Sequence, residues 1–157
     1  MGLRAWILRF LNLFSKASVG SLETPALSPA EPLGRYLLSR SDFSVGNLRT
    51  KPRAFEPSPK TRQTSVFWVG GLSDSEVWDH GDQFVGRVRK KPILARATVT
   101  VRAVEAVGLQ ADFDNDPPRH ANIVGWPESK HETKSRAQEL AAEATLVVRE
   151  QSSALGP

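Results

Sequence analysis

The segment Leu109-Gln-Ala-Asp-Phe-Asp-Asn-Asp-Pro-Pro-Arg-His-Ala-Asn-Ile-Val-Gly-Trp-Pro127 is typical of two strands joined by a turn. Apolar and polar residues alternate over 109–113, which favours a half-buried strand. Residues 114–118 combine Asp, Asn and two prolines, residues that favour a turn. Residues 121–124 form a second β-rich run, closed by Gly125 and Pro127. The segment therefore predicts an antiparallel pair of strands.

The residues on either side of this pair predict helices with well-marked starts. Ser129-Lys-His-Glu132 has the spacing of a capping box and opens a helix whose apolar stripe continues to Val148. Ser73-Asp-Ser-Glu76 is a second capping box, following the β-rich run 64–69. Its helix is expected to end around Arg87–Lys90, before Pro92.

Residues 93–107 fit two structures. Ile93 to Ala103 alternate as in a strand, while Leu94, Ala97, Val101, Val104 and Val107 fit one face of a helix. Gly108 suits the position after a helix end, and Leu109 is placed to contact Val104 across it. This stop signal favours a helix that ends before Gly108, while the choice between helix and strand for 93–101 stays open.

The order of elements predicts an α+β protein. We expect a small mixed or antiparallel sheet with about three helices packed on one of its faces. Residues 1–34 are interpreted as an amphipathic leader and a Pro/Ser-rich linker, residues 35–150 as a single α+β domain beginning with a short strand near Arg35, and residues 151–157 as a disordered tail.

The leader carries a cationic amphipathic pattern over residues 3–14, with Trp6, Phe10 and Phe14 on its apolar side and Arg4 and Arg9 on its polar side. An in-plane membrane anchor has this pattern. A secretory signal is a second interpretation, although Arg9 interrupts its apolar region. The third is an incidental extension. Peripheral membrane contact through residues 3–14 is therefore one hypothesis.

Composition excludes several classes of protein. The chain has 157 residues and no cysteine, which excludes disulfide scaffolds, thiol nucleophiles and thiolate metal sites. No apolar run reaches the ~18 residues of a membrane-spanning helix. The prediction is a cytoplasmic protein, with peripheral membrane attachment as the alternative. A Walker loop, a dinucleotide fingerprint and a Gly-x-Ser-x-Gly elbow are all missing from the sequence, so no cofactor is expected.

Positive charge is concentrated in two segments. Residues 1–63 hold ten Lys and Arg against four Asp and Glu, whereas residues 64–157 hold 11 against 13. The candidate anion- or nucleic-acid-binding residues lie in the basic loop 41–63 and at the end of the first helix: Arg49, Lys51, Arg53, Arg87, Arg89, Lys90 and Lys91. The helix dipole alone also favours cations at a helix C-terminus, and a basic tail is often only solvated.

The strongest candidates for chemistry are Arg119, His120 and Asn122. Arg119 can clamp a phosphate or carboxylate, and His120 can act as a general acid or base. If 121–124 is a strand, His120 and Asn122 share a face. The alternative is that His120 satisfies carbonyls of the turn and Asn122 caps a neighbour. Asp112, Asp114 and Asp116 do not fit a calcium loop, so no metal site is predicted.

The segment Pro118–Pro127, followed by Lys130, Lys134, Ala137, Leu140 and Ala141, resembles a set of small bacterial proteins for which no activity is established. The resemblance extends over residues 35–149 and includes Phe43-Ser44, Lys51–Phe55, Ser65–Phe67 and Leu72–Trp78. It supports a helix before Gly108 but implies no cofactor, partner or mechanism. Where those proteins carry Gly-Arg-Ala-Asp, this chain has Ala95-Arg-Ala-Thr98.

Three functional hypotheses follow. The leading one is a non-catalytic accessory or regulatory binding module for a protein or nucleic-acid partner. The second is a small hydrolase or nuclease that uses His120 with Arg119 and Asn122. The third is a membrane-surface protein held by residues 3–14. Whether the protein is an enzyme stays open, and the lack of catalytic motifs in the sequence favours a non-catalytic role.

Overall fold

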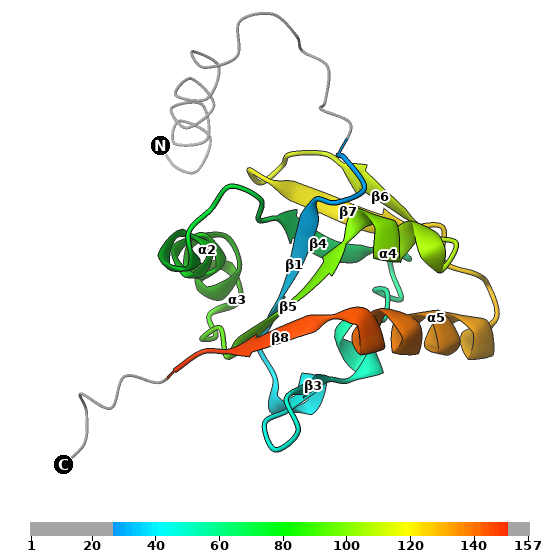
Figure 1. The fold of residues 1–157 in the computed structure, drawn as a ribbon, viewed down its shortest axis with the longest axis horizontal. Coiled ribbons are helices and arrows are strands. Elements are labelled where there is room, and N and C mark those ends of the chain that lie inside the picture. The colour runs from blue at the N-terminus through cyan, green and yellow to red at the C-terminus, as the bar shows by residue number, and fades with distance from the viewer. Residues whose placement is uncertain (1–26, 151–157) are drawn as a thin grey trace, which may run out of the picture.

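The computed structural model describes residues 27–150 (Figure 1). The leader 3–14, most of the linker and the tail 151–157 lie outside the described residues. Between residues 27 and 150, no helix is both long and apolar enough to cross a membrane.

The fold is α+β, as predicted, and its centre is an antiparallel sheet of six strands. Their order across the sheet is β6-β7-β4-β1-β5-β8, and every neighbouring pair is antiparallel. The strands are β1 (Pro32–Leu37), β4 (Thr64–Trp68), β5 (Ala95–Thr100), β6 (Gln110–Phe113), β7 (His120–Val124) and β8 (Thr145–Val148). The quoted segment thus forms the β6–β7 hairpin, and β7 joins that hairpin to the rest of the sheet.

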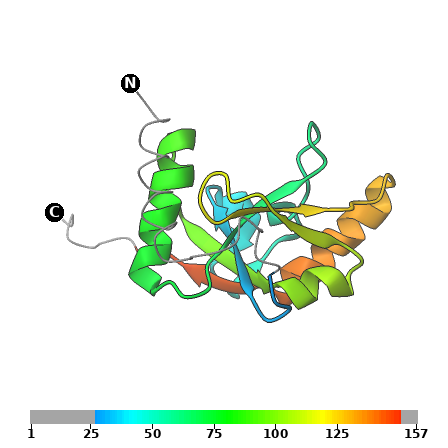
Figure 2. The same cartoon turned by 90° about the horizontal axis from the view of Figure 1, so that it is seen from above.

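Helices cover both faces of this sheet rather than one. The first helical segment consists of α2 (Asp74–Gly81), a π-helical turn η3 (Asp82–Gly86) and α3 (Arg87–Arg89). The other helices are α4 (Val101–Ala106) and α5 (Lys130–Glu143). Figures 1 and 2 show α2 and α3 at the side of the molecule away from β6. On this face the helical segment packs over Phe67 of β4, whereas the ribbons of β6 and β7 lie farther from it.

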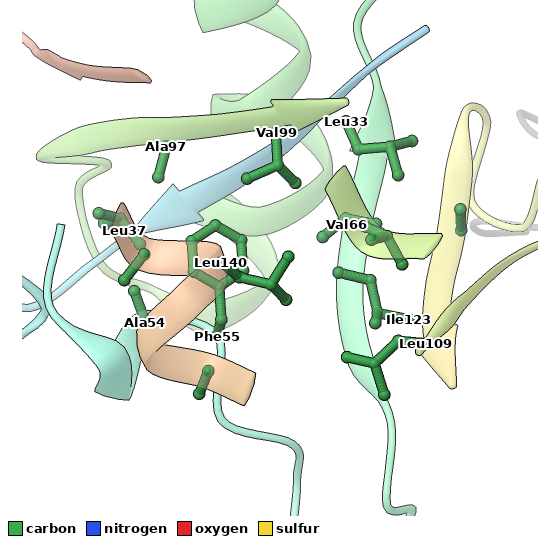
Figure 3. Close-up of a cluster of buried hydrophobic side chains, with 14 of the residues drawn as sticks. Leu33, Leu37, Ala54, Phe55, Val66, Ala97, Val99, Leu109, Ile123 and Leu140 are labelled. Atoms are coloured by element: carbon green, nitrogen blue, oxygen red, sulfur yellow. The ribbon is translucent and has the colours of Figure 1, made fainter. Parts of the chain in front are cut away.

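The main core lies on the α4 and α5 side. Leu33, Val66, Ile123 and Leu140 are buried there around Phe55, which is fully buried (Figure 3). Phe55 follows a short 3-10 helix, η2 (Pro52–Ala54). Phe55 and Phe43 therefore fix the basic loop to the core. The loop also contains η1 (Arg40–Asp42) and a small hairpin of β2 (Phe43–Ser44) and β3 (Arg49–Thr50).

A second, smaller core lies under α2, where Tyr36, Phe67, Val77 and Ile93 are buried. Gly81 allows the close packing here, because a Cβ at that position would come within 2.6 Å of the Tyr36 ring. The predicted capping box of α2 is confirmed: Ser73 and Glu76 exchange side-chain to backbone hydrogen bonds.

Of the two structures that fit 93–107, the helix is wrong for the first part of the stretch. Residues 95–100 form the strand β5, which pairs with β1 on one side and β8 on the other, and only Val101–Ala106 are helical. Backbone pairing on both edges outweighs the helical spacing of the apolar residues. The stop signal itself is correct: Leu109 donates to Val104 and Gly108 to Glu105, and Gly108 has a φ of 77°.

The boundaries at both ends of the domain also differ from the prediction. The last helix ends at Glu143, and Thr145–Val148 form β8 rather than the continuation of the helical stripe, because these mostly β-branched residues complete the sheet beside β5. The first strand begins at Pro32 rather than Arg35, since Pro32 and Leu33 already pair with Thr100 and Val99. Pro32 is the first residue of its strand, a position that proline tolerates.

Candidate functional site

The candidate site lies on the sheet face opposite the main core, where β4 and β7 run side by side. Ser65 pairs with Asn122, and Phe67 pairs with His120. Directly paired residues of antiparallel strands point to the same face, so all four side chains lie together. The prediction that His120 and Asn122 share a face is thus confirmed.

A continuous hydrogen-bonded chain links the polar side chains at this site. The Ser65 hydroxyl oxygen lies 2.6 Å from His120 Nε2, and Asp114 Oδ1 lies 2.6 Å from His120 Nδ1. Asn122 donates from Nδ2 to the other carboxylate oxygen, Asp114 Oδ2, over 3.1 Å. Both ring nitrogens of His120 are therefore engaged, one by a hydroxyl and one by a carboxylate.

The carboxylate determines the tautomer of the His120 ring. Because ionised Asp114 can only accept, His120 Nδ1 carries the hydrogen that joins the two side chains. In the neutral ring Nε2 is then an acceptor, and the Ser65 hydroxyl donates to it. Hydroxyl, imidazole and carboxylate in this order form the relay that activates a serine nucleophile.

Burial holds the ring in place while leaving the relay open to solvent. The His120 side chain is 12% exposed and the Asp114 side chain 42%. The Phe67 ring meets His120 edge-on, with ring centroids 5.2 Å apart. Ser65 is half-buried. The imidazole is therefore packed against Phe67, and the Asp114 carboxylate is the more exposed end of the hydrogen-bonded chain.

The β6–β7 turn places the carboxylate. Backbone amides of Asp114 and Asn115 both donate to the carbonyl of His120, over 3.2 and 2.9 Å. The Asn115 side chain in turn accepts from the amide of Arg119 over 2.8 Å. These contacts close the turn and direct the Asp114 carboxylate at the imidazole.

Arg119 does not join His120 and Asn122. Its guanidinium donates to the carbonyls of Trp68 and Gly70, over 3.1 and 2.9 Å, and lies 4.6 Å from the centre of the Trp68 ring. Partial burial lowers its pKa. The structure thus places Arg119 as a link between the turn and the end of β4.

A hollow of about 220 Å³ lies beside this turn, between α2 and Pro118. His80 lines it and hydrogen-bonds through Nε2 to the carbonyl of Pro118 (2.9 Å) and through Nδ1 with the Tyr36 hydroxyl (3.1 Å). Burial lowers the pKa of His80 and raises that of Tyr36. The Phe67 ring meets both His80 and His120 edge-on, with ring centroids 4.9 and 5.2 Å apart, so one buried aromatic ring contacts both histidines.

The two predicted basic clusters lie on opposite faces of the sheet. Arg49, Lys51 and Arg53 belong to the segment that packs against α5, and Arg53 pairs with Asp42 at 3.7 Å. Arg87, Arg89, Lys90 and Lys91 end the helical segment that covers the second core, and all four are exposed. Neither cluster belongs to the Ser65–His120–Asp114 chain.

Sequence reasoning missed Ser65 and gave Asp114 no role. Ser65 is 55 residues from His120, and only the strand register brings the two together. The polar Ser65 in an otherwise mostly apolar β-rich run was a signal that this position lies outside the main core. Across residues 27–150 there is no group of three or more metal-binding side chains, and Asp112, Asp114 and Asp116 form no such group.

Comparison of the chain with protein-family models, with curated proteins and with solved structures found no match.

Proposed function

We propose that the protein is a small hydrolase of the serine type, acting on ester or amide bonds. The observation that carries this proposal is the Ser65–His120–Asp114 chain, in which both hydrogen bonds measure 2.6 Å. Ser65 and His120 are the catalytic residues. Asp114 and Asn122 are positioning residues, because they act on the substrate only through the imidazole.

The reaction follows from the tautomer of the ring. The Ser65 oxygen attacks the carbonyl carbon of the substrate while its proton passes to His120 Nε2. The imidazolium that forms is stabilised by Asp114 at Nδ1. His120 then gives the proton to the leaving alcohol or amine, which departs and leaves the acyl group on the Ser65 oxygen. Water repeats the two steps, releases the acid and restores the serine.

An ester or amide fits the site better than a phosphodiester. A nuclease needs a cation at the scissile phosphate, and Arg119, the predicted clamp, is bound to two backbone carbonyls and stacked on Trp68. The acidic side chain of Asp112 shares the sheet face with Asn122. Repulsion between this carboxylate and a phosphate further favours an uncharged reacting group.

Hydrolysis of short nitrophenyl esters by the full chain tests the proposal. We expect release of nitrophenol above the buffer rate, and its loss in Ser65→Ala. The matched control is Ser75→Ala, which removes an exposed hydroxyl from the first turn of α2. Thermal unfolding of each variant reports on the fold. Equal rates for Ser65→Ala and Ser75→Ala, with both variants folded, would contradict a serine nucleophile.

The non-catalytic binding module is the second candidate. What favours it is the exposure of the cations in residues 87–91, a segment with four cations and no acidic residue. These residues lie apart from the proposed catalytic chain, so binding there and hydrolysis at Ser65 are compatible in one molecule.

A further inference from the structure

Cations from two distant parts of the sequence gather at one end of the sheet. Leu37, the last residue of β1, pairs with Ala95, the first residue of β5. The chain reaches η1 and the β2–β3 hairpin directly after β1, and α3 directly before β5 (Figure 1). This basic end carries eight exposed cations: Arg40, Arg49, Lys51, Arg53, Arg87, Arg89, Lys90 and Lys91.

Few of these charges are neutralised by neighbours. Arg53 pairs with Asp42 at 3.7 Å, and the charge of Arg87 acts on Asp82. Asp82 itself is already held by both terminal nitrogens of Arg149, over 2.6 and 2.8 Å. Within residues 27–150, the other six cations of the basic end make no ion pair. Their positive charge therefore faces solvent.

The same end carries exposed aliphatic side chains. The large hydrophobic residues that are exposed in the described part of the chain are Val45 (53%), Leu48 (62%), Val88 (68%) and Val147 (36%). Val45 and Leu48 belong to the loop between β2 and β3, and Val88 lies between Arg87 and Arg89. Val147 precedes Val148, the partner of Ala95. At this end of the sheet, exposed aliphatic side chains thus stand beside cations on both faces: Leu48 precedes Arg49, and Val88 lies between Arg87 and Arg89.

We propose that the basic end docks on an anionic lipid surface. Cations near such a surface are attracted by its negative potential, and aliphatic side chains among them enter the interfacial region. A single-stranded nucleic acid instead stacks its bases on exposed aromatic rings. The aromatic residues of the basic loop, Phe43 and Phe55, are buried, which favours the lipid surface. This docking involves the folded domain itself and is independent of residues 3–14.

Co-sedimentation of the full chain with vesicles tests the proposal. The vesicles contain phosphatidylserine and phosphatidylcholine in equal parts, or phosphatidylcholine alone. We expect binding to the anionic vesicles only. Each cation near the surface contributes about fivefold, so Arg89→Gln/Lys90→Gln/Lys91→Gln is expected to bind about a hundredfold more weakly. Val88→Ser keeps the charge and is expected to lose about threefold.

The matched control is Arg102→Gln/Lys130→Gln/Lys134→Gln, which removes the same charge from exposed positions on α4 and α5. All variants keep residues 1–26, so any contribution of the leader is constant. Binding of the control close to that of the unaltered chain supports the proposal. It is overturned if the control weakens as much as the triple variant, if either test variant binds unchanged, or if the chain binds single-stranded RNA but not the anionic vesicles.

Discussion

Replacement of Asp114 by Asn is expected to stop the proposed reaction by reversing the tautomer of His120. Asp114 accepts three hydrogen bonds: Oδ1 accepts from His120 Nδ1 at 2.6 Å and from the backbone amide of Asp116 at 3.3 Å, and Oδ2 accepts from Asn122 Nδ2 at 3.1 Å. An amide at this position has only one oxygen. If that oxygen accepts from Asn122, whose hydrogen bond is shorter than that of the Asp116 amide, the amide nitrogen faces His120 Nδ1, which must then accept. The hydrogen moves to Nε2, and the ring can no longer receive the proton of Ser65.

The expected loss is large in activity and small in stability. In a serine–histidine–aspartate relay, the wrong tautomer lowers the rate by about 10⁴-fold. Asp114 is 42% exposed, so its hydrogen bonds in the folded state are expected to contribute only about 1–2 kcal/mol to the free energy of unfolding. Ester hydrolysis and urea unfolding of the same preparation separate the two effects.

The arrangement also predicts a rescue. In Asp114→Asn/Asn122→Asp, the new carboxylate at position 122 accepts from the amide nitrogen at position 114, so the amide oxygen at position 114 faces His120 Nδ1 again. We expect the Nδ1–H tautomer, read from the ring nitrogen chemical shifts by NMR, to be lost in the single variant and regained in the double variant. Part of the activity should return with it. An unchanged tautomer in Asp114→Asn would refute the reasoning.

Three further predictions concern the fold around the site. Phe55→Ala leaves a cavity in the main core, because Phe55 is fully buried, and is expected to lower the free energy of unfolding in urea by about 3–5 kcal/mol. Ser73→Ala removes one half of the α2 capping box and is expected to cost about 1 kcal/mol in the same assay, with exposed Ser75→Ala as its control. Burial lowers the pKa of His80 from its ordinary value of 6.5, so the unfolded chain binds the proton more readily than the folded one, and stability is expected to fall as the pH decreases below about 6.5. His80→Gln should flatten that dependence, and an equally steep loss of stability in the variant would contradict it.

Local signals in the sequence predict the parts of the fold that neighbouring residues determine. The Ser73 capping box and the helix stop at Gly108 depend on contacts within a few residues, and the structure confirms both. The apolar spacing of residues 95–100 and 145–148 fits a helix, and a helix is wrong for both segments. For residues 95–100 the alternation fits a strand as well, and in both segments the choice of a strand depends on pairing partners far away in the sequence.

In the candidate site, too, some residues are predictable from the local sequence and others depend on the tertiary structure. The shared face of His120 and Asn122 is predictable because the period of a strand requires it. Ser65 requires the register between β4 and β7, and Asp114 requires the closed geometry of the turn. Arg119 lies next to His120 in the sequence, but its guanidinium donates to the carbonyls of Trp68 and Gly70 instead of joining His120. Arg119 precedes β7 and has a φ of 72°, so the alternation of strand residues does not predict where its side chain lies.

The most direct test of the central claim is covalent labelling of the full chain with a fluorophosphonate. An activated serine displaces fluoride and keeps the phosphonyl group, and mass spectrometry of the digested protein locates the adduct. The relay predicts one adduct, on the peptide that contains Ser65, formed in the folded protein and greatly slowed by Asp114→Asn. Labelling confined to other serines, or a rate at Ser65 that Asp114→Asn leaves unchanged, would contradict the account.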